Sequence, residues 1–418
     1  MVGLGAEPGD GGGRQPEQGA RPPRLLVTTG GSGGHIYPAL AIAAGVRRRW
    51  GASEVLFVGA RGGIEERLVP EAGFPLETIA VRGIIRKRPQ EALVAGLTLG
   101  GAVARAIAIV RRFRPDVVVG TGGYAAGPVG LAAVLLRVPL VLQEQNAVPG
   151  VTNRLLARFA SVVAVPHPEA RDRFPRGTRF LVCGNPVRPE VAAADPALAR
   201  RRLGVPAAGR IVLMFAGSLG STVFMRYFRE MLPHLHEGTL LFVSGRNYLQ
   251  AAQAAAAGRE AGGGGVVVVP YLADIGLGLA AADLVVCRSG AMTLAELATV
   301  GRAAILIPSP HVTHHHQEAN AQSFARAGAA RVLAEADLDG RRLAVEVQAL
   351  LGDPAARRRM AEAARGLARP DALGRIVAAV EQAARGRRGG LVSPTPHRGS
   401  IRRGIDPSVP GGSDAGER

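Results

Sequence analysis

Short apolar runs alternate with amphipathic stretches over most of the chain. In the first half the apolar runs fall at residues 25–27, 54–58, 76–81, 115–120, 138–142, 162–165 and 180–185. Stretches between them, such as residues 36–50 and 65–72, carry apolar residues at helical spacing. Strands that are apolar throughout are typical of parallel sheets covered by helices on both faces. The pattern therefore predicts an α/β domain.

The same alternation restarts in the second half of the chain. Residues 184–189, GNPVRP, have the composition of a hinge. Beyond them we expect strands at residues 210–215, 240–244, 266–269, 283–287 and 303–307, and helices at residues 196–203, at 272–281 and from 288 onward. Two halves of this kind predict two doubly wound, Rossmann-like domains that face each other across a cleft.

The ends of the chain differ in composition from its centre. Residues 1–23 form a lead-in, and residues 387–418 form a tail of glycine, arginine, proline and serine; we expect both to be disordered. Between them we expect an N-terminal domain over residues 24–187, a C-terminal domain over 188–367, and a helix over 368–386 that returns to the N-terminal domain. No signal-peptide pattern opens the chain, which predicts a cytosolic location. The uncharged residues 117–136 contain the turn GTGGYAAGP and so predict a strand, a turn and a helix instead of a membrane span.

The composition narrows the functional classes. The 418-residue chain has a formal net charge of +18, nearly all of it from arginine, because Lys87 is the only lysine. Such a protein tends to collect at anionic surfaces, whether nucleic acid or phospholipid. Aromatic residues make up only 4% of the chain, which leaves few platforms for base stacking and argues against a nucleic-acid partner. Cys183 and Cys287 offer no disulfide framework and predict buried side chains in a reducing compartment.

A glycine-rich turn follows the first predicted strand, and a histidine follows the turn. Gly30, Gly31, Gly33 and Gly34 leave backbone N–H groups open where a helix is expected to begin. Such a helix start favours an anionic group such as a phosphate, although a tight turn without a ligand has the same composition. His35 can act as a base near neutral pH.

Two further glycine-rich turns follow predicted strands, at residues 121–128 and 216–221. The strand ends of a parallel sheet converge on one edge, so the first two turns could hold a diphosphate between them. Residues 143–150, QEQNAVPG, would reach the same edge and bring Glu144 there.

The segment from residue 82 to residue 114 combines a basic start with an apolar continuation. The start carries Arg86, Lys87 and Arg88, and the continuation includes Leu93 and Leu97. One interpretation is a patch that binds a bilayer surface. The other is that the apolar side packs on the sheet while the arginines are solvated. The sequence leaves both open.

Six motifs together resemble a known family. In chain order they read GGSGGHIYPALA, GTGGYAAGP, QEQNAVPGVTNRLLA, GNPVR, CRSGAMTLAEL and HHQEANA, within about residues 24–385. They resemble the bacterial enzymes of peptidoglycan synthesis that make lipid II from lipid I. The resemblance implies a GT-B glycosyltransferase that moves N-acetylglucosamine, with inversion, from UDP-N-acetylglucosamine to the C4 hydroxyl of the muramyl sugar of lipid I. It also implies no cofactor or metal, a peripheral place on the cytoplasmic side of the cell membrane, and a role in cell shape and division beside other cell-wall proteins.

The resemblance carries site residues onto this chain. It assigns UDP-N-acetylglucosamine to Ser32, Gly33, Gly34, Asn146, Arg188, Ser218, Leu272, Ala291, Met292, Thr293, Leu294, Ala295, Glu296 and Gln317. We expect the acceptor diphosphate at Gly31, Gly122, Gly123 and Tyr124. The candidate base is His35, with Glu144 as its competitor, and the sequence leaves that choice open.

The residue types suit these roles. The two carboxylate oxygens of Glu296 could accept both ribose hydroxyls, and Arg188 could clamp a phosphate when the domains close. We expect Leu272 to contact the uracil through its backbone, and Gln317 and Asn320 to reach sugar hydroxyls.

Some positions depart from the family or imitate other sites. Leu219 and Ser221 replace a glutamine and an alanine that are common in the third turn, and His315 stands where many relatives have aspartate. Asp337 and Asp339 match the DxD pattern of metal-using transferases, but we expect an acidic pair at a helix start. The run His314 to His316 predicts a polar loop beside the sugar instead of a metal site.

Three rival functions remain at this point. A GT-B enzyme that glycosylates diacylglycerol has an uncharged acceptor, which two phosphate-type turns in the N-terminal domain disfavour. A UDP-N-acetylglucosamine 2-epimerase has a similar two-domain fold but needs no membrane patch. A basic nucleic-acid-binding protein would explain the charge but not the ordered glycine turns.

Overall fold

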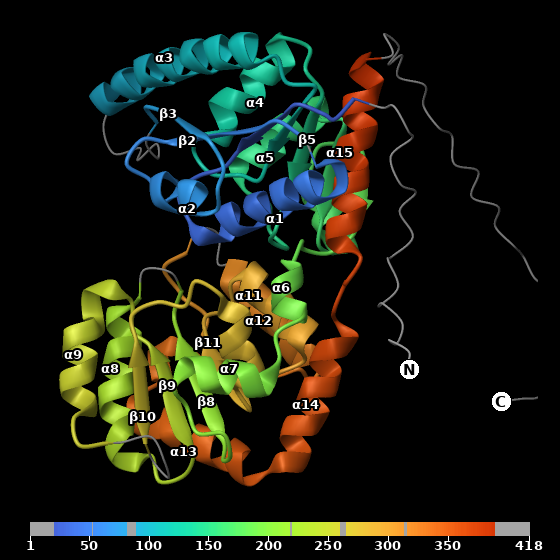
Figure 1. Ribbon diagram of the computed structural model, residues 1–418. Helices are drawn as coiled ribbons and strands as arrows, with labels where there is room; N and C mark the ends of the chain where they lie inside the picture. Colours follow the sequence, from blue (N-terminus) through green and yellow to red (C-terminus); the bar gives the residue numbers. More distant parts are fainter. Residues whose placement is uncertain are drawn as a thin grey trace, which may run out of the picture.

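The computed structural model describes residues 21–51, 53–81, 89–217, 220–259, 265–312 and 316–388. These residues form two parallel sheets, each covered by helices on both faces (Figure 1). The N-terminal sheet has seven strands: β1 (Leu25–Thr28), β2 (Val55–Ala60), β3 (Leu76–Ile79), β4 (Val117–Gly120), β5 (Leu140–Gln143), β6 (Val162–Val165) and β7 (Phe180–Val182). Their spatial order is β3-β2-β1-β4-β5-β6-β7, so the order reverses beside β1.

The C-terminal sheet repeats this arrangement with six strands. They are β8 (Ile211–Phe215), β9 (Thr239–Val243), β10 (Val266–Val269), β11 (Leu284–Cys287), β12 (Ala303–Leu306) and β13 (Ala330–Val332), in the order β10-β9-β8-β11-β12-β13. In each sheet the first strand lies between two others: β1 pairs with β2 and β4, and β8 pairs with β9 and β11. Ligands of doubly wound sheets bind at that reversal, beyond the carboxyl ends of the strands.

The helices fall into two groups. The N-terminal half contains α1 (Gly33–Trp50), α2 (Glu65–Glu71), α3 (Pro89–Phe113), α4 (Ala126–Leu135), α5 (Val151–Leu156) and the short 3₁₀ segment η1 (Ala157–Phe159). The C-terminal half contains α6 (Pro189–Ala192), α7 (Pro196–Leu203), α8 (Thr222–Met231), α9 (Leu249–Ala256), α10 (Ile275–Ala281), α11 (Ala291–Val300), α12 (His316–Arg326), α13 (Gly340–Gly352) and α14 (Pro354–Gly366). The last helix is α15 (Ala372–Arg388).

Both faces of each sheet are buried, which explains the apolar runs. In β1, Leu25 and Val27 belong to one core, while Leu26 between them belongs to the core on the opposite face. Successive side chains of a strand point to opposite faces, so a sheet covered on both sides needs apolar residues at every position. The C-terminal sheet is sandwiched between two cores in the same way.

The end of the chain crosses back to the N-terminal half. Figure 1 shows α15, in red, beside α1 and the N-terminal sheet. Val377 of α15 approaches α1 so closely that a Cβ at Gly45 would lie 2.9 Å from its side chain. Glu381 accepts a hydrogen bond from the Trp50 indole at 2.6 Å and pairs with Arg49. The exact domain boundaries at residues 187 and 367 stay predictions.

The α/β prediction with two doubly wound sheets is confirmed, and the differences are local. The helix expected from residue 272 begins at Ile275, because the Asp274 carboxylate accepts a hydrogen bond from the Gly276 N–H at 3.0 Å and caps it there. The helix expected from residue 288 begins at Ala291, and the strand expected to reach residue 185 ends at Val182.

The uncharged stretch over residues 117–136 forms β4, a turn and α4, as predicted. No helix in the described part of the chain is long and apolar enough to cross a membrane. Cys183 and Cys287 are both buried and free, which agrees with the prediction of small core residues.

Candidate active site

A cavity of about 700 Å³ lies between the carboxyl ends of the two sheets. Both halves of the chain line it, and most of the residues that the sequence singled out meet there. These are Gly31, Ser32, Gly33, Gly34, His35, Gly122, Gly123, Tyr124, Glu144, Asn146, Arg188, Leu272, Ala291, Met292, Thr293, Glu296 and Gln317.

Several predicted residues are not among those that line the cavity. Leu294 packs in a core of the C-terminal half, because it lies on the side of α11 that faces the sheet, and Ala295 beside it is also absent from the lining. Ser218 and Leu219 lie outside the described residues, as do Arg86, Lys87 and Arg88. Leu93 and Leu97 lie in α3, but their side chains are outside the described part of the structure.

The first two glycine-rich turns interlock. Gly123 has a φ of 85°, and a Cβ there would lie 2.0 Å from the Gly30 carbonyl oxygen. Gly122 has a φ of 96°, and a Cβ there would lie 2.9 Å from the ring of His35. Only glycine fits such contacts in the left-handed region. The prediction that these turns meet at one edge of the sheet is thereby confirmed.

His35 lies in the first turn of α1 and borders the cavity. Its Nδ1 lies 3.1 Å from the Ser32 hydroxyl, and the Thr121 hydroxyl donates a hydrogen bond to its backbone oxygen at 2.9 Å. Burial lowers the pKa of His35, while the negative charge of Glu144 acts in the opposite direction. A lowered pKa keeps the imidazole neutral near pH 7, the form that can accept a proton.

Glu144 follows β5 and is buried with its carboxylate saturated by hydrogen bonds. Its Oε1 accepts from the backbone N–H and the side-chain amide of Asn146, at 2.9 and 3.2 Å. Its Oε2 accepts from the Gly150 N–H at 3.0 Å and from the Asn153 amide at 2.9 Å. A carboxylate offers about four lone-pair positions, and all are in use here. The contacts thus hold the loop between β5 and α5, and they leave His35 freer than Glu144 to take a proton.

Glu296 lies on the opposite wall, in α11, and differs from Glu144. Its side chain is 6% exposed and lines the cavity, yet it accepts no hydrogen bond from the described residues. Burial raises the pKa of Glu296 to about 7, and the positive charge of Arg188 acts against that rise. A buried polar group without partners is costly, so this carboxyl is well prepared to bind ligand hydroxyls.

Residues from the two halves touch across the cavity mouth. The hydroxyl of Tyr37, in α1, forms a short hydrogen bond with the hydroxyl of Tyr271, which follows β10. The Arg188 guanidinium lies 5.1 Å from the centre of the Tyr37 ring, and Arg67 of α2 lies 5.5 Å from that of Tyr271. The Nε of Arg188 is buried without a hydrogen-bond partner. These contacts bridge the two halves beside Leu272.

A chain of hydrogen bonds fixes the start of α12. The Gln317 side-chain oxygen accepts from the Ser309 N–H at 2.9 Å, and the Ser289 hydroxyl donates to the Gln317 backbone oxygen at 2.7 Å. The Asn320 amide donates to the Ser289 backbone oxygen at 3.2 Å. Gln317 therefore keeps its amide NH₂ group for a ligand, whereas Asn320 is buried and engaged.

The acidic pair has a structural role, whereas the histidine run is described only at His316, the first residue of α12. Asp339 caps α13 by accepting a hydrogen bond from the Arg342 N–H at 2.7 Å, as predicted for an acidic pair at a helix start. His316 lines the cavity, whereas His314 and His315 lie outside the described residues. Among the residues that the structure describes, no group of three or more histidine, cysteine or acidic side chains is placed to hold a metal ion.

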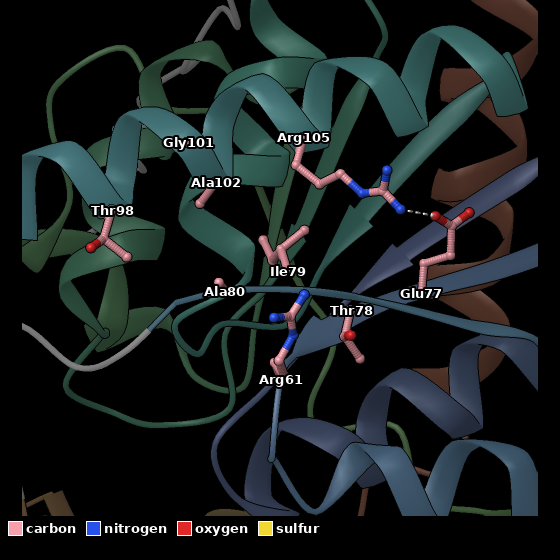
Figure 2. Close-up of a pocket in the computed structure, with 9 residues that line it drawn as sticks. All are labelled: Arg61, Glu77, Thr78, Ile79, Ala80, Thr98, Gly101, Ala102 and Arg105. Carbon is pink, nitrogen blue, oxygen red and sulfur yellow. Dashed lines mark hydrogen bonds and ion pairs between the residues drawn. The ribbon is translucent and has the colours of Figure 1, made fainter.

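A second hollow of about 450 Å³ lies between the edge strand β3 and α3 (Figure 2). Arg61 and Arg105 line it with Glu77, and Arg105 pairs with Glu77 at 3.5 Å. Figure 2 shows the Arg61 side chain pointing along the hollow near Ile79 and Ala80. No predicted catalytic or donor-binding residue lines this hollow, so the cavity between the sheets is the candidate active site.

The sequence did not single out Tyr37, Tyr271, Asn153 or Glu65 as site residues. Tyr37 and Asn153 fall inside the quoted motifs HIYP and GVTN, and their position there was the available signal. Tyr271 precedes Leu272 directly. Glu65 follows a glycine-containing turn at the start of a helix, and nothing in the neighbouring sequence indicates that its carboxyl is buried.

Known proteins match nearly the whole described chain. The model of the glycosyltransferase family 28 N-terminal domain matches residues 25–165, and that of the glycosyltransferase family 28 C-terminal domain matches residues 211–376. A "UDP-N-acetylglucosamine--N-acetylmuramyl-(pentapeptide) pyrophosphoryl-undecaprenol N-acetylglucosamine transferase" of Desulforudis audaxviator is 40% identical over 372 residues, which cover 86% of this chain and 98% of that protein. The protein of the same name from Symbiobacterium thermophilum is 43% identical over 351 residues, covering 84% and 93%.

A solved structure agrees with these relatives. The crystal structure of MurG from Acinetobacter baumannii superposes with a TM-score of 0.67 at 29% identity, covering 86% of this chain and 100% of that one. Two doubly wound sheets whose carboxyl ends enclose one cavity, together with the family 28 models, define a GT-B glycosyltransferase. Within that class, the chain belongs to the family of UDP-N-acetylglucosamine--N-acetylmuramyl-(pentapeptide) pyrophosphoryl-undecaprenol N-acetylglucosamine transferases. The resemblance inferred from the six motifs is confirmed.

Proposed function

We propose that this chain transfers N-acetylglucosamine from UDP-N-acetylglucosamine to the C4 hydroxyl of the muramyl sugar of lipid I, and so forms lipid II. The observation that carries the proposal is the asymmetry of the cavity between the sheets. One wall holds a neutral histidine beside two interlocked glycine turns, and the other holds an unsatisfied carboxyl beside a helix start. An inverting transferase needs a base on the acceptor side and a site for a nucleotide sugar opposite.

The donor lies mainly on the C-terminal wall in this proposal, and the N-terminal wall contributes Ser32, Gly33, Gly34 and Asn146. Glu296 accepts the two ribose hydroxyls, which replace the hydrogen bonds that its carboxyl lacks. Helix α11 begins at Ala291, where its first backbone N–H groups are open and the helix dipole is positive. This helix start holds the diphosphate of the donor. The backbone of Leu272 contacts the uracil, and the free amide of Gln317 reaches the sugar.

The acceptor belongs to the N-terminal wall. His35 takes the proton of the C4 hydroxyl as that oxygen attacks the anomeric carbon from the face opposite the diphosphate. The O–H bond breaks and an N–H bond forms on the imidazole, while the new C–O bond forms and the bond to UDP breaks with its electron pair on the diphosphate. Arg188 and the start of α11 stabilise the charge that develops there. Glu144 does not take the proton, because its four lone-pair positions are occupied.

The proposed base also suits the pH at which such a reaction runs. Burial lowers the pKa of His35, so the free imidazole predominates near neutral pH. Once protonated, His35 is stabilised by the nearby Glu144 carboxylate. The glycine turns, with Gly31, Gly122 and Gly123, then lie close enough to hold the acceptor diphosphate through backbone N–H groups.

We also propose that the N-terminal half binds the surface of a membrane. Large apolar side chains are exposed on α4, α5 and η1, and we call them the apolar face: Leu131 (40% exposed), Leu135 (58%), Leu155 (69%) and Phe159 (56%). Arg154 and Arg158 are exposed on α5 and η1, and Arg137 is exposed just after the end of α4. An apolar surface flanked by arginines suits an anionic bilayer, where the lipid-linked acceptor resides.

The transfer reaction has a direct test. The protein is incubated with radiolabelled UDP-N-acetylglucosamine and either lipid I or diacylglycerol, and label in the lipid fraction is counted. We expect label with lipid I only. Label on diacylglycerol alone, or free N-acetylmannosamine from an epimerase reaction, would refute the proposal.

Membrane binding is tested by sedimentation with vesicles that contain phosphatidylglycerol. We expect the double variant Leu155→Ser/Phe159→Ser to reduce the vesicle-bound fraction several-fold. High salt should reduce the bound fraction of the wild-type protein. Val345→Ser is the matched control, because Val345 is 62% exposed but lies on α13 in the other half. Equal losses of vesicle binding in the control and in the apolar-face variant would contradict the proposed membrane surface.

A further inference from the structure

Glu65 is a buried carboxyl that the reaction described above does not use. It is the first residue of α2 and is 0% exposed. Its Oε1 accepts a hydrogen bond from the Ala60 N–H at 2.8 Å, and its Oε2 is buried without any hydrogen-bond partner. Among the ion pairs of the described residues, none includes Glu65. A buried carboxylate with neither a cation nor a full set of donors costs free energy, so the fold alone does not explain it.

Three glycines enclose this carboxyl. A Cβ at Gly30 would lie 2.9 Å from the Glu65 Oε1, and a Cβ at Gly63 would lie 2.3 Å from its Oε2. A Cβ at Gly59 would lie 2.5 Å from its Cγ. The side chain is therefore wedged between the end of β2 and the glycine-rich turn that follows β1. It reaches the back of the turn whose front borders the cavity.

The negative charge of Glu65 acts on His35 across the glycine-rich turn. Gly30 packs beside the Glu65 carboxylate, and its backbone oxygen accepts a hydrogen bond from the His35 imidazole. The charged or titratable groups that act on His35 are Glu65 from α2, Glu144 after β5 and His316 of α12. The two carboxylates raise the pKa of His35, whereas His316 and burial lower it. Glu144 acts on His35 from the loop between β5 and α5. Glu65 is the carboxylate that packs against the glycine-rich turn itself.

We propose that Glu65 is a positioning residue for the transfer reaction: its buried carboxylate braces the glycine-rich turn and, together with Glu144, stabilises His35 once that histidine has taken the acceptor proton. The inference rests on the proposed function, in which His35 is the base. It predicts that the negative charge of Glu65 matters as well as its shape. Glutamine keeps the shape and an oxygen for the Ala60 N–H but removes the charge.

Glu66 offers a matched control. It is the neighbouring residue of α2, is exposed, and accepts a hydrogen bond from the Gly62 N–H at 2.9 Å. Glu66→Gln therefore makes the same chemical change one position away, on the solvent side. Long-range or net-charge effects would act on both variants, whereas the proposed role concerns Glu65→Gln alone.

The test is an NMR titration of ¹³C-labelled histidine in the intact protein, with the His35 signal assigned by its loss in His35→Gln. We expect Glu65→Gln to lower the pKa of His35 by about 0.5 to 1 unit, and Glu66→Gln to leave it unchanged. If Glu65→Gln does not fold, Gly30→Ala perturbs the same contact from the turn side and should shift the pKa in the same direction. A His35 pKa that stays unchanged in a folded variant would overturn the inference.

Kinetics supply the second readout. Glu65→Gln should lower kcat of transfer to lipid I about tenfold, move the acid limb of the pH profile to lower pH, and leave KM for UDP-N-acetylglucosamine unchanged. An unshifted acid limb would reduce Glu65 to a structural role and overturn the inference. A wild-type protein that transfers no sugar would refute the proposed function, whereas the NMR comparison would still decide whether Glu65 acts on His35.

Discussion

Glu144 and Glu296 are buried carboxyls on opposite walls of one cavity, and they differ in what surrounds them. Glu144 accepts four hydrogen bonds from the loop it organises. Glu296 accepts none from the described residues, and burial raises its pKa to about 7. The N-terminal wall is thus assembled in the free protein, whereas the C-terminal wall keeps a polar group for a ligand.

The difference separates structural carboxylates from binding ones. A carboxylate saturated by protein donors stabilises its loop and has no lone pair left for a substrate. An unsatisfied one destabilises the free protein and regains that energy when a ligand supplies hydroxyls. The same criterion disfavours Glu144 as the base and supports Glu296 as the ribose ligand. Substitutions on the two walls should therefore have opposite effects on stability.

The largest expected effect is on catalysis, from His35. His35→Ala removes the proposed base, and kcat of transfer to lipid I should fall by about 10²- to 10⁴-fold, the usual range for a general base. KM for the donor should change little, because His35 is on the acceptor wall. Steady-state kinetics with labelled donor measure both quantities. Turnover close to that of the wild type would rule out His35.

Next in size is the effect of removing the Glu144 carboxylate. Glu144→Ala leaves the donors of Asn146, Gly150 and Asn153 without an acceptor, and the free energy of unfolding should fall by about 2 to 5 kcal/mol. Urea denaturation measures the loss. Glu190→Ala is the control, because Glu190 forms only an exposed pair with Arg48 at 3.9 Å, a kind of pair that contributes at most about 1 kcal/mol. Equal losses in the two variants would contradict the bracing role.

Glu296 should show the opposite sign. Its pKa in the folded protein, about 7, exceeds the ordinary value of 4.5, so its stabilising contribution is complete below about pH 4.5 and is lost as the pH rises through 7. Glu296→Gln is neutral at every pH and should therefore be more stable than the wild type above pH 7, by at most about 3 kcal/mol. Thermal denaturation at pH 5 and pH 8.5 tests this. A variant that is less stable at pH 8.5 would contradict it.

The smallest expected effect is at the contact between the two halves. Tyr37→Phe removes one hydroxyl of the pair with Tyr271, and the donor KM should rise about two- to tenfold, as the loss of one hydrogen bond implies. Tyr271→Phe should cost the same, and the double variant no more than either single one. Additive effects in this cycle would mean that the two hydroxyls act independently.

Much of this molecule could be predicted from its sequence, because local patterns determine much of it. The apolar runs predicted the strands, since both faces of each sheet are covered. The two glycine-rich turns that follow the first and fourth strands were expected to converge at one edge of the sheet, and Gly123 lies against Gly30 there. Most of the site residues that the motifs predicted do line the cavity.

What the sequence did not reveal depends on contacts between distant residues. The proposal of His35 instead of Glu144 as the base rests on the hydrogen bonds that Glu144 accepts from its own loop. The pair of Tyr37 and Tyr271 joins residues 234 positions apart. Glu65 looks like any acidic residue in the first turn of a helix, where such residues are usually solvated. Its burial follows from glycines of two different turns, one of them before α1.

The central claim is that the C-terminal wall of the cavity holds most of the donor, whereas the N-terminal wall holds the acceptor and its base. Isothermal titration calorimetry of UDP-N-acetylglucosamine, without acceptor, tests it directly on the wild type, His35→Ala and Glu296→Gln. We predict that His35→Ala binds the donor with a Kd within about twofold of the wild type, and that Glu296→Gln binds about tenfold more weakly. Strong binding by Glu296→Gln together with weak binding by His35→Ala would contradict the assignment of the two walls.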